Sequence, residues 1–188
     1  MSAVRAAEYP ATRITDTAGA RVRIASVLAF VLSLATILGA WGFQLIGHYI
    51  PCALCLQQRI PYYVGVPVLA VASIVAFSGR STVTVRWLLA LGAIVFLVGA
   101  GLGVRHAGVE WGWWEGPANC GTTSAPALTN AGDLLNVLRN THLVTCTEAS
   151  WRFLGLSFAG WNAVISAAVA GIAAWGALTA RPRHSGRW

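Results

Sequence analysis

The chain has 188 residues, of which 56% are hydrophobic and only 10% are charged, whereas roughly a quarter of the residues of an average soluble domain are charged. This composition, with a mean hydropathy of +0.64, excludes an ordinary soluble enzyme and indicates a membrane protein. The net charge of +7 comes from 13 arginines without any lysine. No cluster of arginines alternates with aromatic residues on a polar face, so nucleic acid is not expected as a partner.

Four apolar stretches are long enough to cross the bilayer core, which takes about 20 helical residues. They lie at about 24–46, 60–79, 87–104 and 160–180. The first stretch is too long for the core of a signal peptide and lacks an A-x-A-like cleavage site, so we expect it to be retained. The sequence therefore predicts an all-α membrane protein, a four-transmembrane-helix bundle over residues 23–180. Short tails at 1–22 and 181–188 flank it, the first of them expected to be disordered.

The arginines predict the orientation of this bundle, because positive residues near span ends stay on the cytoplasmic side. Nine of the 13 arginines lie in the two tails, directly before the first span (Arg23) and in the short loop between the second and third spans. The other four, and all four cysteines, lie in the loops at 47–59 and 105–159. We therefore expect both termini in the cytoplasm and the cysteines on the outer, oxidising side, where disulfides persist.

A Cys-x-x-Cys motif, Cys52 and Cys55, stands in the stretch IPCALCLQQRIPYY. A disulfide across two residues closes almost no loop, so reversible redox chemistry is its usual use. Pro51 suits a helix start, and the first turn of a helix favours a thiolate through its free N–H groups and dipole. Arg59, four residues beyond Cys55, would favour that thiolate from the same helix face. The alternative for Arg59 is an arginine that reaches out to the membrane interface.

The second outer loop holds Cys120 and Cys146. Four cysteines allow three pairings, and their spacing does not choose among them. A disulfide that staples this loop without any chemistry is an open alternative. Between the two, ALTNAGDLLNVLRN predicts a short amphipathic helix, lying either on the membrane surface or on the bundle. No metal site is expected, because a second Cys-x-x-Cys or a spaced histidine pair is missing.

Three features together resemble the disulfide bond formation protein B (DsbB) family: the residues PCALCLQQRIPY, the order of the four cysteines, and the block CTEASWRFLGLSFAGWN at 146–162. The resemblance covers nearly all of residues 24–180. It implies a quinone-dependent thiol oxidase of the bacterial cell inner membrane that reoxidises DsbA, a periplasmic thioredoxin-fold oxidase.

By the same resemblance, Cys120 and Cys146 would form the disulfide that exchanges with DsbA. Electrons would then pass to Cys52 and Cys55, and from Cys55 to membrane ubiquinone or menaquinone, with Arg59 polarising the quinone.

His106 resembles the family's histidine upstream of the first loop cysteine, which is linked to the quinone headgroup. A neutral imidazole there would donate a hydrogen bond to a quinone oxygen or relay a proton, and an ordinary polar residue at the interface is the alternative. Glu110 differs from the amide of the best-known family member, so no quinone contact is assigned to it.

Two other functions remain open. One is a quinone-linked thiol oxidoreductase of the vitamin K epoxide reductase type, although there the loop cysteines precede the Cys-x-x-Cys. The other is a non-catalytic membrane scaffold with a stapled outer loop.

Overall fold

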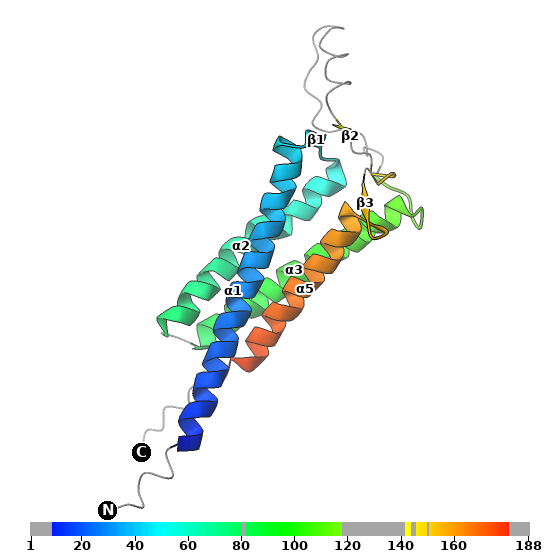
Figure 1. The fold of residues 1–188 in the computed structure, drawn as a ribbon. Coiled ribbons are helices and arrows are strands. Elements are labelled where there is room, and N and C mark those ends of the chain that lie inside the picture. The colour runs from blue at the N-terminus through cyan, green and yellow to red at the C-terminus, as the bar shows by residue number, and fades with distance from the viewer. Residues whose placement is uncertain (1–8, 80–81, 118–141, 144–145, 150, 181–188) are drawn as a thin grey trace, which may run out of the picture.

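The computed structural model describes residues 9–79, 82–117, 142–143, 146–149 and 151–180. Within them, four long helices form the molecule: α1 (Tyr9–Leu45), α2 (Ala53–Ser78), α3 (Thr82–Glu110) and α5 (Phe158–Thr179) (Figure 1). All four are long and apolar enough to cross a membrane. The all-α bundle with four membrane-spanning helices is thus confirmed.

The helices pack in a ring, in which α1 contacts α2 and α5 while α3 contacts the same two helices. Leu69, Phe96 and Val169 are fully buried at its centre. The outward side chains are apolar as well, with Ile74 68% and Ile94 60% exposed. Helices that are apolar on all sides suit a lipid environment, so the chain is a multi-pass membrane protein.

All four helices start before the membrane spans that the sequence predicts, α1 and α2 by the most residues. Residues 9–22, expected to be part of a disordered tail, continue α1 as helix, because extending a formed helix adds one hydrogen bond for each residue fixed. Residues 53–59 precede the predicted span at about 60–79 and belong to α2, in agreement with the helix start predicted at Pro51, because Cys52 caps the helix at this point.

Short strands close the end of the bundle where α2 begins (Figure 1). β1 (Tyr49–Ile50) pairs in parallel with β2 (His142–Leu143), and β3 (Arg152–Phe153) pairs antiparallel with β4 (Leu156–Ser157). Two-residue strands are too short to leave an alternating pattern, and the sequence does not predict them.

The expected amphipathic helix at 127–140 and Cys120 lie outside the described residues. The cytoplasmic position of both termini stays a prediction.

The closest approach of α3 to α5 suggests a test of the packing. A methyl group added at Gly103 would lie 2.7 Å from the backbone nitrogen of Ala163 and 2.8 Å from its Cα. These backbone atoms have little freedom to move away, so we expect Gly103→Ala to lower the free energy of unfolding by about 1–3 kcal/mol, as in other overpacked sites. Denaturation of the purified protein in detergent measures this loss.

Gly101→Ala is the matched control, because a methyl group there meets nothing within 4 Å. It is expected to keep or slightly raise the stability, since alanine favours helix more than glycine does. Equal stability of the two variants would contradict the close α3–α5 contact.

Candidate functional site

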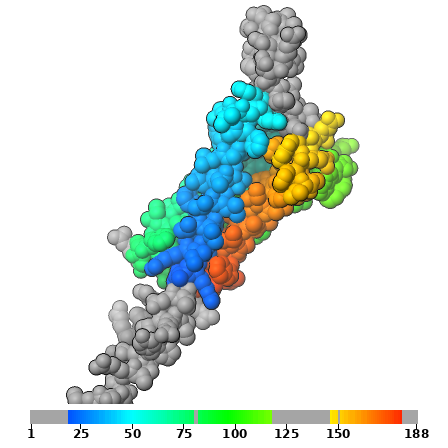
Figure 2. All heavy atoms as spheres, in the orientation of Figure 1, coloured from blue at the N-terminus to red at the C-terminus, as the bar shows by residue number. Residues whose placement is uncertain are grey.

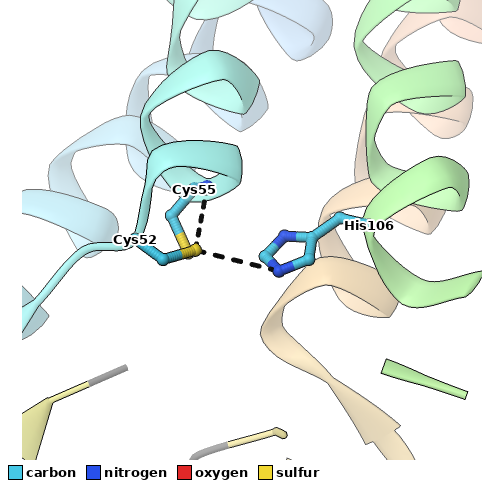
Figure 3. A group of neighbouring side chains, drawn as sticks. All are labelled: Cys52, Cys55 and His106. Atoms are coloured by element: carbon cyan, nitrogen blue, oxygen red, sulfur yellow. Dashed lines mark hydrogen bonds between the residues drawn. The ribbon is translucent and has the colours of Figure 1, made fainter. Parts of the chain in front are cut away.

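The two cysteines of the Cys-x-x-Cys stand at the start of α2, as the sequence predicts. Cys52 is the N-cap residue, and its Sγ accepts a hydrogen bond from the backbone N–H of Cys55 at 3.3 Å (Figure 3). The two sulfur atoms are 2.8 Å apart. Cys52 is fully buried, whereas Cys55 is only partly buried. The helix start thus holds both sulfurs together but leaves only Cys55 partly accessible.

His106 comes from α3 and faces the Cys52 sulfur (Figure 3). Its Nε2 lies 3.8 Å from Cys52 Sγ, and the residue is 3% exposed. Glu110 follows one turn later on α3, with its Oε1 3.9 Å from the same Nε2. The structure therefore brings His106 to the redox pair, while its contact with a quinone stays a prediction.

A chain of buried polar side chains holds the histidine ring. Gln58 Nε2 donates to His106 Nδ1 at 2.5 Å, and Asn162 Nδ2 donates to Gln58 Oε1 at 2.6 Å. The Tyr62 hydroxyl donates to Asn162 Oδ1 at 2.8 Å and lies 3.0 Å from Ser166 Oγ. Three helices, α2, α3 and α5, are joined in this way.

The sequence reasoning missed this polar chain, although its signal is present. Gln58 and Tyr62 are four residues apart on α2, and Asn162 and Ser166 are four residues apart on α5. Residues at this spacing share a helix face. Polar residues inside a membrane span are costly and usually face one another, so two such pairs predict a contact between the helices.

Hydrogen bonding and burial decide which thiol keeps its proton. The hydrogen bond with Cys55, followed by burial, raises the pKa of Cys52 from 9.0 to about 12, against a smaller lowering by the hydrogen bond with His106. The Cys52 thiol therefore keeps its proton at neutral pH.

A cavity of about 450 Å³ opens beside Cys55, within the range of about 300–1,000 Å³ that is typical of ligand pockets. It lies between α1, α2 and α5; α1 and α5 are neighbours on the face shown in Figure 2. The cavity is mainly apolar, with aromatic walls formed by Phe43, Tyr49, Phe158 and Trp161. Its polar lining includes Arg59, His106 and Glu110.

Arg59 is anchored to α1 across this cavity. Its Nη1 donates to Gln44 Oε1 at 2.5 Å and its Nη2 to the carbonyl oxygen of Ala40 at 3.4 Å. The guanidinium carbon lies 5.7 Å from the centre of the Trp41 ring. A flat, apolar molecule that carries hydrogen-bond acceptors, such as a quinone, fits this combination of aromatic walls and a fixed donor.

Cys146 is fully buried in one apolar cluster with Cys52, Leu54 and Val109, and Cys55 packs against that cluster. The structure thus brings one loop cysteine to the Cys-x-x-Cys.

Three residues that can bind a metal ion also lie together here, since the ligand atoms of Cys52, Cys55 and His106 lie within 4.8 Å of one another. A structural zinc site takes four ligands, and the expectation that no metal binds stays a prediction.

The raised pKa of Cys52 can be measured by alkylation of the reduced protein over a pH series, with mass spectrometry to resolve each site. Because only the thiolate reacts, we expect alkylation of Cys52 to rise only as the pH approaches 12. Cys55→Ala removes the main cause of the shift and should move this rise to lower pH. The unfolded protein is the control, with a midpoint near 9.0. A folded midpoint at that same value would contradict the geometry.

Comparison with known proteins shows which family the chain belongs to. The chain matches the family model of the disulfide bond formation protein DsbB over residues 22–176. It is 31% identical over 144 residues to disulfide bond formation protein B of Methylococcus capsulatus, covering 74% of this chain and 84% of the relative. The protein of the same name from Hahella chejuensis is 31% identical over 167 residues, covering 82% of this chain and 94% of the relative.

A third relative, disulfide bond formation protein B of Nitrosococcus oceani, is 28% identical over 163 residues, covering 82% of this chain and 90% of the relative. No solved structure matches the chain significantly. The family match covers all or most of each of the four helices and includes all four cysteine positions, three of which the structure describes. The chain therefore belongs to the disulfide bond formation protein DsbB family.

Proposed function

We propose that this protein is an inner-membrane thiol oxidase that reoxidises a DsbA-like periplasmic partner by disulfide exchange and passes the electrons to membrane quinone. The observation that carries the proposal is the cavity beside Cys55, which is mainly apolar and also lined by the anchored Arg59. A buried thiol pair next to such a cavity is placed to meet an acceptor that is dissolved in lipid. Family membership supports the disulfide chemistry.

The first half of the reaction is disulfide exchange. The partner's dithiol is oxidised as the Cys120–Cys146 disulfide is reduced to two thiols, through a mixed disulfide. The two loop thiols then reduce the Cys52–Cys55 disulfide and become a disulfide again. The burial of Cys146 in one cluster with Cys52 supports this second transfer, because the attacking and the accepting sulfurs have to come into contact.

The second half takes place at the cavity. A bound quinone supplies an acceptor for two electrons and two protons. Cys55 borders the cavity, while Cys52 behind it keeps its proton until the disulfide closes. Arg59 would hold an oxygen of the acceptor and stabilise negative charge on it, and its hydrogen bond to Gln44 keeps the guanidinium oriented for this task. The aromatic walls would exclude water from the reacting sulfur.

The location of the site follows from the same arguments. We propose that the Cys-x-x-Cys end of the bundle faces the periplasm, because the arginines at the other end favour the cytoplasm. At this end of the bundle, the partner would reach the loop cysteines from the periplasm, whereas the quinone would reach Cys55 from the lipid.

The direct test uses the purified protein, a reduced thioredoxin-fold dithiol partner and a short-chain ubiquinone analogue, with quinone absorbance as the readout. We expect quinone reduction that depends on the partner, and its loss in Cys52→Ser and in Cys55→Ser, since each removes one sulfur of the pair. A non-catalytic scaffold with a stapled loop predicts no reduction at all. That outcome, or full activity in either serine variant, would contradict the proposal.

The role of Arg59 can be separated from the exchange step in single-turnover experiments. Arg59→Ala should slow quinone reduction at least about tenfold, since loss of one such stabilising donor typically costs more than that, and leave partner oxidation by the loop disulfide unchanged. Arg105→Ala is the matched control, because it removes the same charge near the same end of the bundle from a residue that does not line the cavity. Equal slowing of both steps in Arg59→Ala would contradict this role.

A further inference from the structure

The hydrogen bonds of Gln58 fix which nitrogen of His106 carries the proton. One side-chain atom of Gln58 lies 3.5 Å from the backbone oxygen of Leu54 and 2.5 Å from His106 Nδ1. A carbonyl oxygen can only accept, so this atom is the amide nitrogen, and it donates to Nδ1 as well. A neutral imidazole has one donor and one acceptor nitrogen. The proton of the neutral ring is therefore on Nε2.

This assignment determines what His106 can do for Cys52. Nε2 is the nitrogen that faces the Cys52 sulfur at 3.8 Å. With its proton on that side and Nδ1 occupied by Gln58, the ring donates a hydrogen bond toward the sulfur. It has no vacant nitrogen to take the thiol proton, so a different group has to accept it.

Glu110 is the buried carboxyl group beside this pair. Its side chain is 5% exposed, and Oε1 lies 3.9 Å from His106 Nε2, on the side of the ring that faces Cys52. Its Oε2 is buried with no hydrogen-bond partner, and no other buried side-chain nitrogen or oxygen in the described part of the chain is left in this state. A buried polar atom without a partner is costly and calls for an explanation. The residue also lines the cavity that Cys55 borders.

We propose, building on the thiol oxidase function above, that Glu110 accepts the proton of Cys52 when the Cys52–Cys55 disulfide closes. In the proposed cycle the electron pair of the closing disulfide would pass to the quinone. Without a quinone, the same closure takes place when Cys55 is joined to a leaving group through a mixed disulfide. The Cys52 sulfur attacks the Cys55 sulfur, the S–H bond of Cys52 breaks, and the new S–S bond forms. The bond between Cys55 and the leaving sulfur breaks, and that sulfur departs as a thiolate with the electron pair. The proton moves to the Glu110 carboxylate, directly or through one water molecule.

Two neighbouring groups are unsuited to this task. The Arg59 guanidinium is always protonated and cannot accept a proton. The Tyr62 hydroxyl already donates to Asn162 and lies next to Ser166, further along α2. Glu110 is the side chain that combines a base, burial and an acceptor oxygen without a partner, and it lies beside His106 Nε2, the nitrogen that faces Cys52.

The test uses no quinone. The full-length protein carrying Cys120→Ser and Cys146→Ala is reduced and mixed with dipyridyl disulfide, and the released thiopyridone is followed by absorbance. Cys55, the more accessible of the two thiols, should react first and give the first release. The attack of Cys52 on the resulting mixed disulfide gives the second release, which reports the proposed step alone.

Glu110→Gln keeps the shape of the side chain but cannot take a proton. We expect it to leave the first release unchanged and to slow the second at least about tenfold, the lower range for loss of a general base. We also expect a larger solvent deuterium isotope effect on the second release and its recovery with added formate. Glu110→Asp, which keeps the carboxyl group, should retain part of the rate.

Three outcomes would overturn the inference: an unchanged second release in Glu110→Gln, equal slowing of both releases, or a slowed second release that formate does not restore. A separate assay tests the proposed function, namely whether the unmodified protein reduces a quinone. If it does not, the proposed function fails whatever Glu110 does. If it does and Glu110→Gln closes its disulfide at the normal rate, only the inference fails.

Discussion

The hydrogen bond between Gln58 and His106 is the contact on which the redox site depends. Both residues are buried, and a polar group buried among apolar side chains is costly unless it is hydrogen-bonded. Through Asn162 and Tyr62 the same chain of bonds reaches α5 and returns to α2. The three helices can satisfy all of these groups in one register only, and that register turns the imidazole toward Cys52.

Burial then gives the two sulfurs of the Cys-x-x-Cys different surroundings. Cys52 is closed in by His106 and by the cluster that contains Cys146, whereas Cys55 borders the cavity. Both sulfurs lie at the cluster that contains the loop cysteine, and of the two cysteines only Cys55 also lines the cavity, although only two residues separate them. The electron relay that we propose, from a water-soluble partner to a lipid-soluble acceptor, needs a disulfide that meets both a loop cysteine and the cavity, and a Cys-x-x-Cys at this helix start is placed to do so.

The local features of this site were predictable from the sequence. The four spans follow from long apolar runs, and the place of Cys52 and Cys55 at a helix start follows from Pro51 and the two-residue spacer. His106 was singled out only through the family resemblance, because nothing near it in the sequence points to residues 54 positions away. The bond between Gln58 and Asn162 joins residues 104 positions apart, and such contacts depend on how the helices rotate against one another.

Glu110 is the clearest case of a feature that the sequence does not predict, since its oxygen without a hydrogen-bond partner depends on how the whole bundle packs and not on any local pattern. The start of α1 was also not predictable, because an apolar run marks only the part of a helix that can lie inside the membrane, whereas α1 begins 15 residues before that run, at Tyr9.

The central claim is that the cavity beside Cys55 receives a quinone, and photolabelling tests it most directly. A photoreactive quinone analogue is activated on the protein in membranes, and the labelled residues are mapped by mass spectrometry. The account predicts labels on the cavity side of α1, between Ala35 and Gln44, or at the start of α5, between Phe158 and Ile165. Excess unlabelled quinone should suppress them. Labels confined to the outward faces of the helices, at residues such as Ile74 or Ile94, would contradict it.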